Sequence, residues 1–100
     1  MRVEVLTIPD CPNGELAVQR TRAALAELGA DPATLRVTTL TSDAAAANAP
    51  FSGSPTILRD GVDLFAGTRA SALACRVYPS DAGPSGAPTA PEIVAALRAH

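Results

Sequence analysis

The sequence contains no lysine and no tryptophan, and only 3% of its 100 residues are aromatic. Its positive charge comes from arginines spread along the chain, and the net charge is −2. Nucleic-acid backbones are bound by clustered basic side chains, so this distribution argues against nucleic acid as a partner. Hydrophobic residues make up 47% of the chain, many of them alanine, which predicts one modest core built mainly from aliphatic side chains.

Long apolar runs are also missing. No run approaches the ~20 residues that a membrane-spanning helix needs, so we expect no membrane partner. The segment Met1–Glu4 leads directly into strand-like sequence, without the apolar region and cleavage site of a signal peptide. We therefore expect a cytoplasmic protein whose two cysteines are thiols rather than a structural disulfide.

Metal ligands are scarce as well. The only histidine, His100, is the last residue, and two cysteines far apart in sequence do not make a four-ligand cage. The sequence therefore predicts no metal site and no cofactor.

Apolar periodicity and turn residues predict a single α/β domain over residues 1–100, with the element order βαβαββα. We expect a four-stranded mixed sheet in the order second, first, third, fourth, with only the fourth strand antiparallel to its neighbour. The first and last helices are expected on one face and a short alanine-rich helix on the other. The predicted strands cover residues 2–8, 35–40, 56–60 and 74–78, and the predicted helices start near residues 12, 43 and 90.

Cys11 is the candidate reactive group. It lies between the first strand and the first helix, and Pro12 fits the first helical position, which makes Cys11 the N-cap. Unpaired N–H groups and the positive end of the helix dipole favour the thiolate at such a position. The alternative is a buried, inert thiol. The turn-forming neighbours favour the reactive interpretation, although the charge of Asp10 opposes the thiolate if it faces the sulfur.

A second segment completes a recognisable pattern. Ser54-Pro55-Thr56 leads into an apolar strand, as Cys11 leads out of one. Together the two segments resemble a minimal thioredoxin fold, in which Cys11 matches the first cysteine of the C-x-x-C motif and Ser54-Pro55-Thr56 matches the cis-proline segment. The chain departs from that motif at Gly14, which stands in place of the second cysteine, so the motif itself cannot close a disulfide.

This resemblance implies a cis peptide bond between Ser54 and Pro55, close to the loop that carries Cys11. It also implies that Pro55 presents its backbone to an extended substrate. The substrate-binding residues carried over from the two segments are Pro12, Asn13, Ser54, Pro55 and Thr56.

Most of the chain is similar to the small bacterial thioredoxin-like proteins labelled alkylmercury lyase. The similarity is carried by residues 11–13, 51–58, 60–65 and 74–78. It implies a second possible site, in which Cys11, Cys75 and the acid Asp10 imitate the two thiolates and the proton donor of an organomercurial lyase.

The distance between the two cysteines is the obstacle to a two-thiol site. A symmetric hairpin places Cys75 opposite Leu58 and Tyr78 nearer Pro55. Cys75 would then lie ~10 Å from the Pro55 end of the sheet. Unless the hairpin is asymmetric, that distance is too long for a direct Cys11–Cys75 disulfide, and Cys75 is then a buried structural thiol.

Three functions therefore stay open. The first is thiol–disulfide exchange or soft-metal binding through Cys11, with a small thiol or a protein disulfide as partner. The second is a two-thiol enzyme that acts on an organomercurial or holds a soft metal. The third is a non-catalytic binding module that uses the Cys11–Pro55 surface. Fast alkylation of Cys11 near neutral pH would separate the first two from the third.

Overall fold

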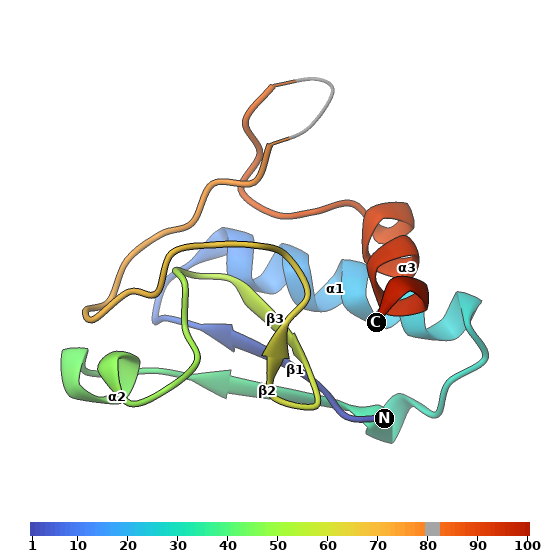
Figure 1. The fold of residues 1–100 in the computed structure, drawn as a ribbon, viewed down its shortest axis with the longest axis horizontal. Helices are drawn as coiled ribbons and strands as arrows, with labels where there is room; N and C mark the ends of the chain where they lie inside the picture. Colours follow the sequence, from blue (N-terminus) through green and yellow to red (C-terminus); the bar gives the residue numbers. More distant parts are fainter. Residues whose placement is uncertain (80–82) are drawn as a thin grey trace.

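The computed structural model describes residues 1–79 and 83–100. In these residues a four-stranded sheet, with strand order β2-β1-β3-β4, packs between helices (Figure 1). The elements are β1 (Val3–Thr7), α1 (Pro12–Glu27), the 3-10 turn η1 (Pro32–Thr34), β2 (Leu35–Thr39), α2 (Asp43–Ala47), β3 (Thr56–Arg59), β4 (Val62–Asp63) and α3 (Ala90–Ala99).

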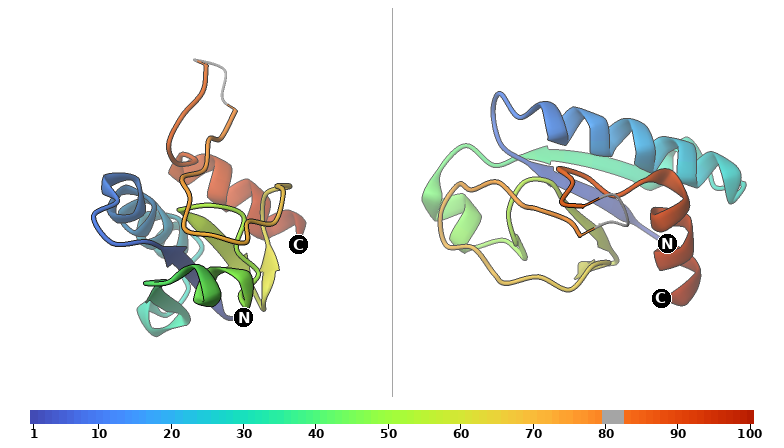
Figure 2. Two further views of the ribbon diagram at one scale, coloured as in Figure 1. Left: turned by 90° about the vertical axis from the view of Figure 1, so that its left-hand side faces the viewer. Right: turned by 90° about the horizontal axis from the view of Figure 1, so that it is seen from above.

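The two faces of the sheet are covered as the sequence predicts. Helices α1 and α3 lie together on one face and α2 lies on the other (Figure 2). Side chains alternate along β1, so Val3 and Val5 enter the α1/α3 core while Leu6 packs with Phe51 on the α2 face. This arrangement is that of a minimal thioredoxin-like α/β fold.

The direction of β3 differs from the prediction. β1 and β2 are parallel, but β3 runs antiparallel to β1, with Val5 opposite Ile57. The connection between β2 and β3, residues 40–55, contains the 5-residue helix α2 and starts β3 from the same end of the sheet at which β2 finishes. As a result, the end of β1 and the start of β3 lie side by side, which a parallel β3 would have prevented.

The fourth strand also differs from the prediction. It is Val62–Asp63, which follows β3 through a two-residue turn at Asp60 and Gly61, both with positive φ (49° and 84°). Residues 74–78 form no strand, because β4 already occupies the edge of β3 where they were expected to pair. They make isolated bridges instead, one of them between Tyr78 and Ser85. The sequence also predicts an irregular connector over residues 80–88, of which residues 80–82 lie outside the described part of the chain.

The predicted helix ends are confirmed. Pro12 opens α1, and the chain leaves that helix at Gly29 with a positive φ of 70°. Ser42 caps α2 through its side chain. Thr89 and Glu92 form a capping box at α3, and the hydrogen bond from the Thr89 backbone lowers the pKa of Glu92 from its ordinary value.

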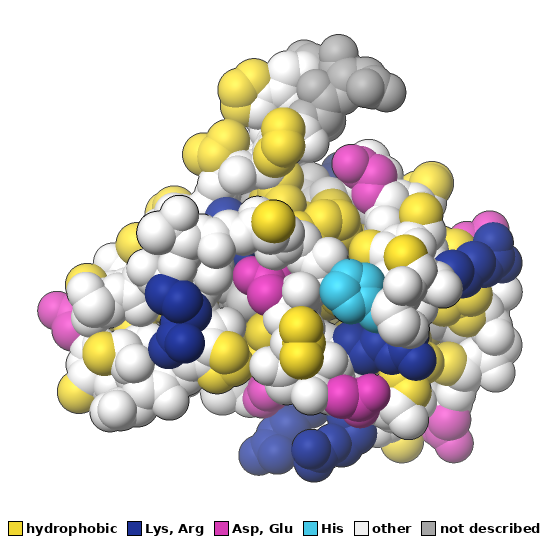
Figure 3. Space-filling view, in the orientation of Figure 1, with side chains coloured by type: hydrophobic (Ala, Val, Ile, Leu, Met, Phe, Trp, Pro, Cys, Tyr) yellow, Lys and Arg dark blue, Asp and Glu magenta, His cyan; other side chains and the backbone are white. Residues whose placement is uncertain are grey.

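On the face shown in Figure 3, arginine side chains lie in separate places with acidic side chains between them. Among the described residues, no helix is both long enough and apolar enough to cross a bilayer.

Helix α1 lies unusually close to β1 at its first turn. A Cβ atom added to Gly14 would be 2.0 Å from Thr7 Oγ1 and 2.9 Å from Thr7 Cβ. Position 14 therefore has no room for a side chain. The departure from the C-x-x-C motif at this position has a steric basis, since a cysteine here would collide with Thr7.

We predict that Gly14→Ala destabilises the protein by about 1–3 kcal/mol, the usual cost of overpacking. Thr7→Ala removes the nearest obstructing atom, so Gly14→Ala should cost less in that background than in the natural sequence. Urea unfolding of the two single variants and the double variant measures the difference. Equal costs in both backgrounds would show that the Gly14–Thr7 contact does not set the packing of α1.

Candidate functional site

Cys11 occupies the junction between β1 and α1. Its backbone is extended, as an N-cap residue requires, and its carbonyl accepts hydrogen bonds from the N–H groups of Gly14 (3.0 Å) and Glu15 (3.4 Å). The side chain is half-buried and makes no capping hydrogen bond with the helix. The helix therefore acts on the sulfur through its dipole and not through a direct N–H contact.

The direct donor to the sulfur is Ser54. Its fully buried hydroxyl lies 3.2 Å from Cys11 Sγ and donates to it. The same oxygen accepts from the Ile8 N–H (3.3 Å) and lies 3.1 Å from Thr7 Oγ1. The Thr7 hydroxyl also reaches the Ile8 carbonyl (3.4 Å), and either hydroxyl can be the donor in the Thr7–Ser54 contact. When Thr7 donates to Ser54, the single Ser54 proton is directed at the sulfur of Cys11.

Sequence reasoning assigned these residues only in part. It placed Ser54 among the substrate-binding residues, whereas the structure gives its side chain to Cys11. Thr7 was missed altogether. The available signal was a hydroxyl side chain at the end of an otherwise aliphatic strand, two residues before Pro9.

The cis-proline prediction is confirmed, but the backbone around it is already occupied. The Ser54–Pro55 bond is cis. The Ser54 N–H donates to the Ala74 carbonyl (2.7 Å), and the Ser54 carbonyl accepts from the Arg76 N–H (2.9 Å). The Pro55 carbonyl accepts from the Tyr78 hydroxyl. Residues 74–78 of the same chain thus occupy the position where an extended substrate was expected to pair with Pro55.

The side chain of Thr56 makes its hydrogen bonds within the protein. It is fully buried, its hydroxyl donates to the Gly53 carbonyl (2.6 Å), and it accepts from the Ser52 N–H (3.0 Å). These two bonds close the turn that leads into Pro55. The Thr56 side chain therefore faces the protein and not a substrate.

Pro12 and Asn13 also differ in what they face. Pro12 is exposed at the start of α1. Asn13 lies under the segment before α3, because a Cβ atom on Gly86 would be only 2.3 Å from Asn13 Cγ. Arg20 holds this segment in place by donating to the carbonyls of Ala87 (3.1 Å) and Pro88 (3.2 Å). Only Pro12 of this pair is on the open side of the site.

A buried arginine fixes the segment that lies against the cis-proline. Arg76 is 7% exposed and donates to the Asp63 carboxylate (2.8 Å) and to the Phe65 carbonyl (2.7 Å). Its guanidinium lies 4.5 Å from the centre of the Tyr78 ring. Burial raises the pKa of Tyr78 above its ordinary value of 10.0, an effect that Arg76 opposes and Asp63 reinforces. This cluster was not predicted from the sequence.

The predicted place of Cys75 is wrong. Cys75 pairs with Ser54 in an isolated parallel bridge and not with Leu58. The reason is that β4 already occupies the edge of β3. Cys75 therefore pairs with Ser54, in the segment that precedes β3. Cys75 is exposed rather than buried, and both cysteines are free thiols. Ser54 thus contacts Cys11 through its side chain and pairs with Cys75 through its backbone, so the two thiols lie around one residue.

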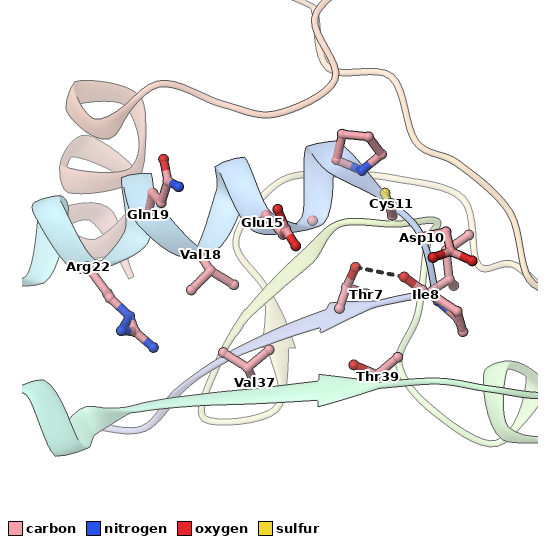
Figure 4. Close-up of a pocket in the computed structure, with 13 residues that line it drawn as sticks. Thr7, Ile8, Asp10, Cys11, Glu15, Val18, Gln19, Arg22, Val37 and Thr39 are labelled. Atoms are coloured by element: carbon pink, nitrogen blue, oxygen red, sulfur yellow. Dashed lines mark hydrogen bonds between the residues drawn. The ribbon is translucent and has the colours of Figure 1, made fainter.

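Asp10 lies next to Cys11 in a left-handed conformation, with φ 57°, which an aspartate tolerates better than most residues. Its side chain is exposed, and Figure 4 shows it beyond Cys11 at the end of a groove. Among the residues that the structure describes, no group of three or more His, Cys, Asp or Glu side chains is placed to hold a metal ion.

The open side of Cys11 is a groove of about 870 Å³ between α1 and β2 (Figure 4). Val18 and Val37 face each other across its middle. Cys11 lies at one end and Arg22 at the other. The remaining lining residues are Thr7, Ile8, Pro9, Asp10, Pro12, Gly14, Glu15, Gln19 and Thr39.

Comparison with known proteins gave no relative: no protein-family model, no curated protein and no solved structure matches this chain.

We predict that Arg76→Met destabilises the protein by about 3 kcal/mol or more, because Asp63 and two carbonyls lose a buried charged partner. The matched control is Arg69→Met. Arg69 is exposed and donates to the Ala49 carbonyl (2.6 Å), so its loss should cost about 1 kcal/mol or less. Urea unfolding measures both, and similar losses would mean that the Arg76 cluster does not hold this segment.

Proposed function

We propose that this protein is a thioredoxin-like thiol protein that carries out thiol–disulfide exchange through Cys11, with a small thiol or a protein disulfide as its partner. The observation that carries the proposal is the Ser54 hydroxyl donating to Cys11 Sγ at the N-terminus of α1. Two independent features, the N-terminus of a helix and a buried hydroxyl donor, meet at the same half-buried sulfur.

The reaction follows the ordinary course of thiol exchange. The Cys11 thiolate attacks one sulfur of a disulfide, that S–S bond breaks, and a mixed disulfide forms while the leaving thiolate takes a proton from water. A second thiol from solution then attacks the mixed disulfide and releases Cys11. No cysteine at position 14 can do this, because Thr7 leaves no room there.

A second candidate is a two-thiol site that uses Cys11 and Cys75. The pairing of Cys75 with Ser54 favours it, because it removes the separation expected from a symmetric hairpin. Two thiolates around Ser54 would bind a soft metal or the mercury of an organomercurial, and the exposed Asp10, which precedes Cys11 in the chain, would be the acid.

We predict that Cys11→Ser abolishes fast alkylation by iodoacetamide at pH 7, whereas Cys75→Ser leaves most of it intact. Mass spectrometry of the modified residue against time measures both rates. Equal loss from the two substitutions would favour the two-thiol site. A Cys11 that reacts only in the unfolded protein would contradict both thiol functions and leave a non-catalytic binding module.

We further predict that Ser54→Ala slows alkylation of Cys11 at pH 7 by about tenfold, since a hydrogen bond to a charged group is worth ~1.5 kcal/mol or more. Ser42→Ala, which removes the cap of the distant helix α2, is the control and should leave the rate unchanged. Circular dichroism shows whether each variant is folded. An unchanged rate in folded Ser54→Ala would remove the main support for a reactive Cys11.

A further inference from the structure

Among the described residues, two sides of Cys11 differ in how accessible they are to a substrate. On the side of the cis-proline, the backbone of Ser54 is paired with Ala74 and Arg76, and the Pro55 carbonyl is bonded to Tyr78. On the other side the groove between α1 and β2 is open and begins at Cys11 (Figure 4). The part of a substrate that extends away from its reacting sulfur therefore lies in this groove.

The groove has opposite charges at its two ends. Asp10 and Glu15 are exposed near Cys11, and Arg22 is exposed at the far end. Among the described residues, none of these three side chains has a hydrogen-bond or ion-pair partner. The charges are thus available to a ligand that is positive near Cys11 and negative further along.

The length of the groove limits the ligand. At a rise of about 1.5 Å per residue, Cys11 and Arg22 are ~16 Å apart along α1. Because helical side chains lean towards the helix N-terminus, the guanidinium lies roughly 10 Å from the sulfur end. An extended peptide covers ~3.3 Å per residue, so the gap corresponds to about three residues. Val18 and Val37, which face each other midway, suit an apolar side chain in the centre.

We propose that this groove is the substrate subsite of Cys11, and that it takes a short peptide with an N-terminal cysteine and a free C-terminal carboxylate. The peptide ammonium lies near Asp10 and Glu15, its cysteine sulfur meets Cys11, and its carboxylate binds Arg22. The proposal rests on the thiol exchange proposed above and adds the class and direction of the substrate.

The test uses the tripeptide Cys-Val-Ala with its cysteine carried as a mixed disulfide with 2-thiopyridine. The Cys11 thiolate attacks the peptide sulfur, the bond to the pyridyl sulfur breaks, and pyridine-2-thione leaves and is followed by its absorbance. To keep Cys75 out of the signal, all proteins carry Cys75→Ser. Three forms are compared, namely the free peptide, its C-terminal amide and its N-acetyl derivative.

We expect the free peptide to react roughly two- to fivefold faster than either derivative, the advantage that an exposed ion pair gives. With Arg22→Gln, the free peptide should no longer react faster than the amide, but it should still react faster than the N-acetyl derivative. With Glu15→Gln, the rate advantage over the N-acetyl derivative should fall, while the advantage over the amide should remain. Arg98→Gln, an exposed arginine on α3, is the matched control and should keep both. High salt should weaken each preference.

The two proposals fail in different ways. Fast thione release at equal rates from all three peptides, or a carboxylate preference that survives Arg22→Gln, overturns the subsite and leaves thiol exchange standing. Slow release from all three peptides, together with slow alkylation of Cys11 by iodoacetamide, overturns the proposed function and the subsite with it.

Discussion

The site depends on the contacts of one buried serine. The Ser54 hydroxyl accepts a hydrogen bond from the Ile8 N–H, just after β1, and donates one to the sulfur of Cys11. The Ser54 backbone forms hydrogen bonds with the residues on either side of Cys75. Three segments distant in sequence are thereby joined at one residue. Because a buried hydroxyl that loses a partner is costly, each contact restrains the other two. The position of the Cys11 sulfur is thus set by the sheet and by the helix together.

The antiparallel direction of β3 makes these contacts possible. Cys11 comes shortly after the end of β1 and Ser54 shortly before the start of β3, so the two meet because these strands run in opposite directions. Residues 40–55 carry the chain from the end of β2 to the start of β3 at the same end of the sheet. The direction of β3 therefore brings the Ser54 hydroxyl to the Cys11 sulfur.

Much of the fold could be read from the sequence, because local signals specify it. Capping residues and prolines located the starts of α1, α2 and α3, aliphatic runs located β1 and β3, and alternation located β2. Strand direction and the place of Cys75 could not be read, because they depend on how far each connection travels in space. The Arg76 cluster was hidden for a similar reason. Its partners, Asp63 and Phe65, are joined to it by a loop that has no periodic pattern.

The same packing explains why the site is open in one direction. Near Cys11, the first turn of α1 packs directly against Thr7. Residues 74–78, which Arg76 holds in place, cover the cis-proline segment. Both closures come from contacts that the fold needs, so neither is available to a ligand. The edge strand β2 has a strand partner on one side only, and Val37 remains 42% exposed beside α1. The accessible surface beside Cys11 is therefore formed by residues of α1 and β2, and not by the proline segment that marks the site in the sequence.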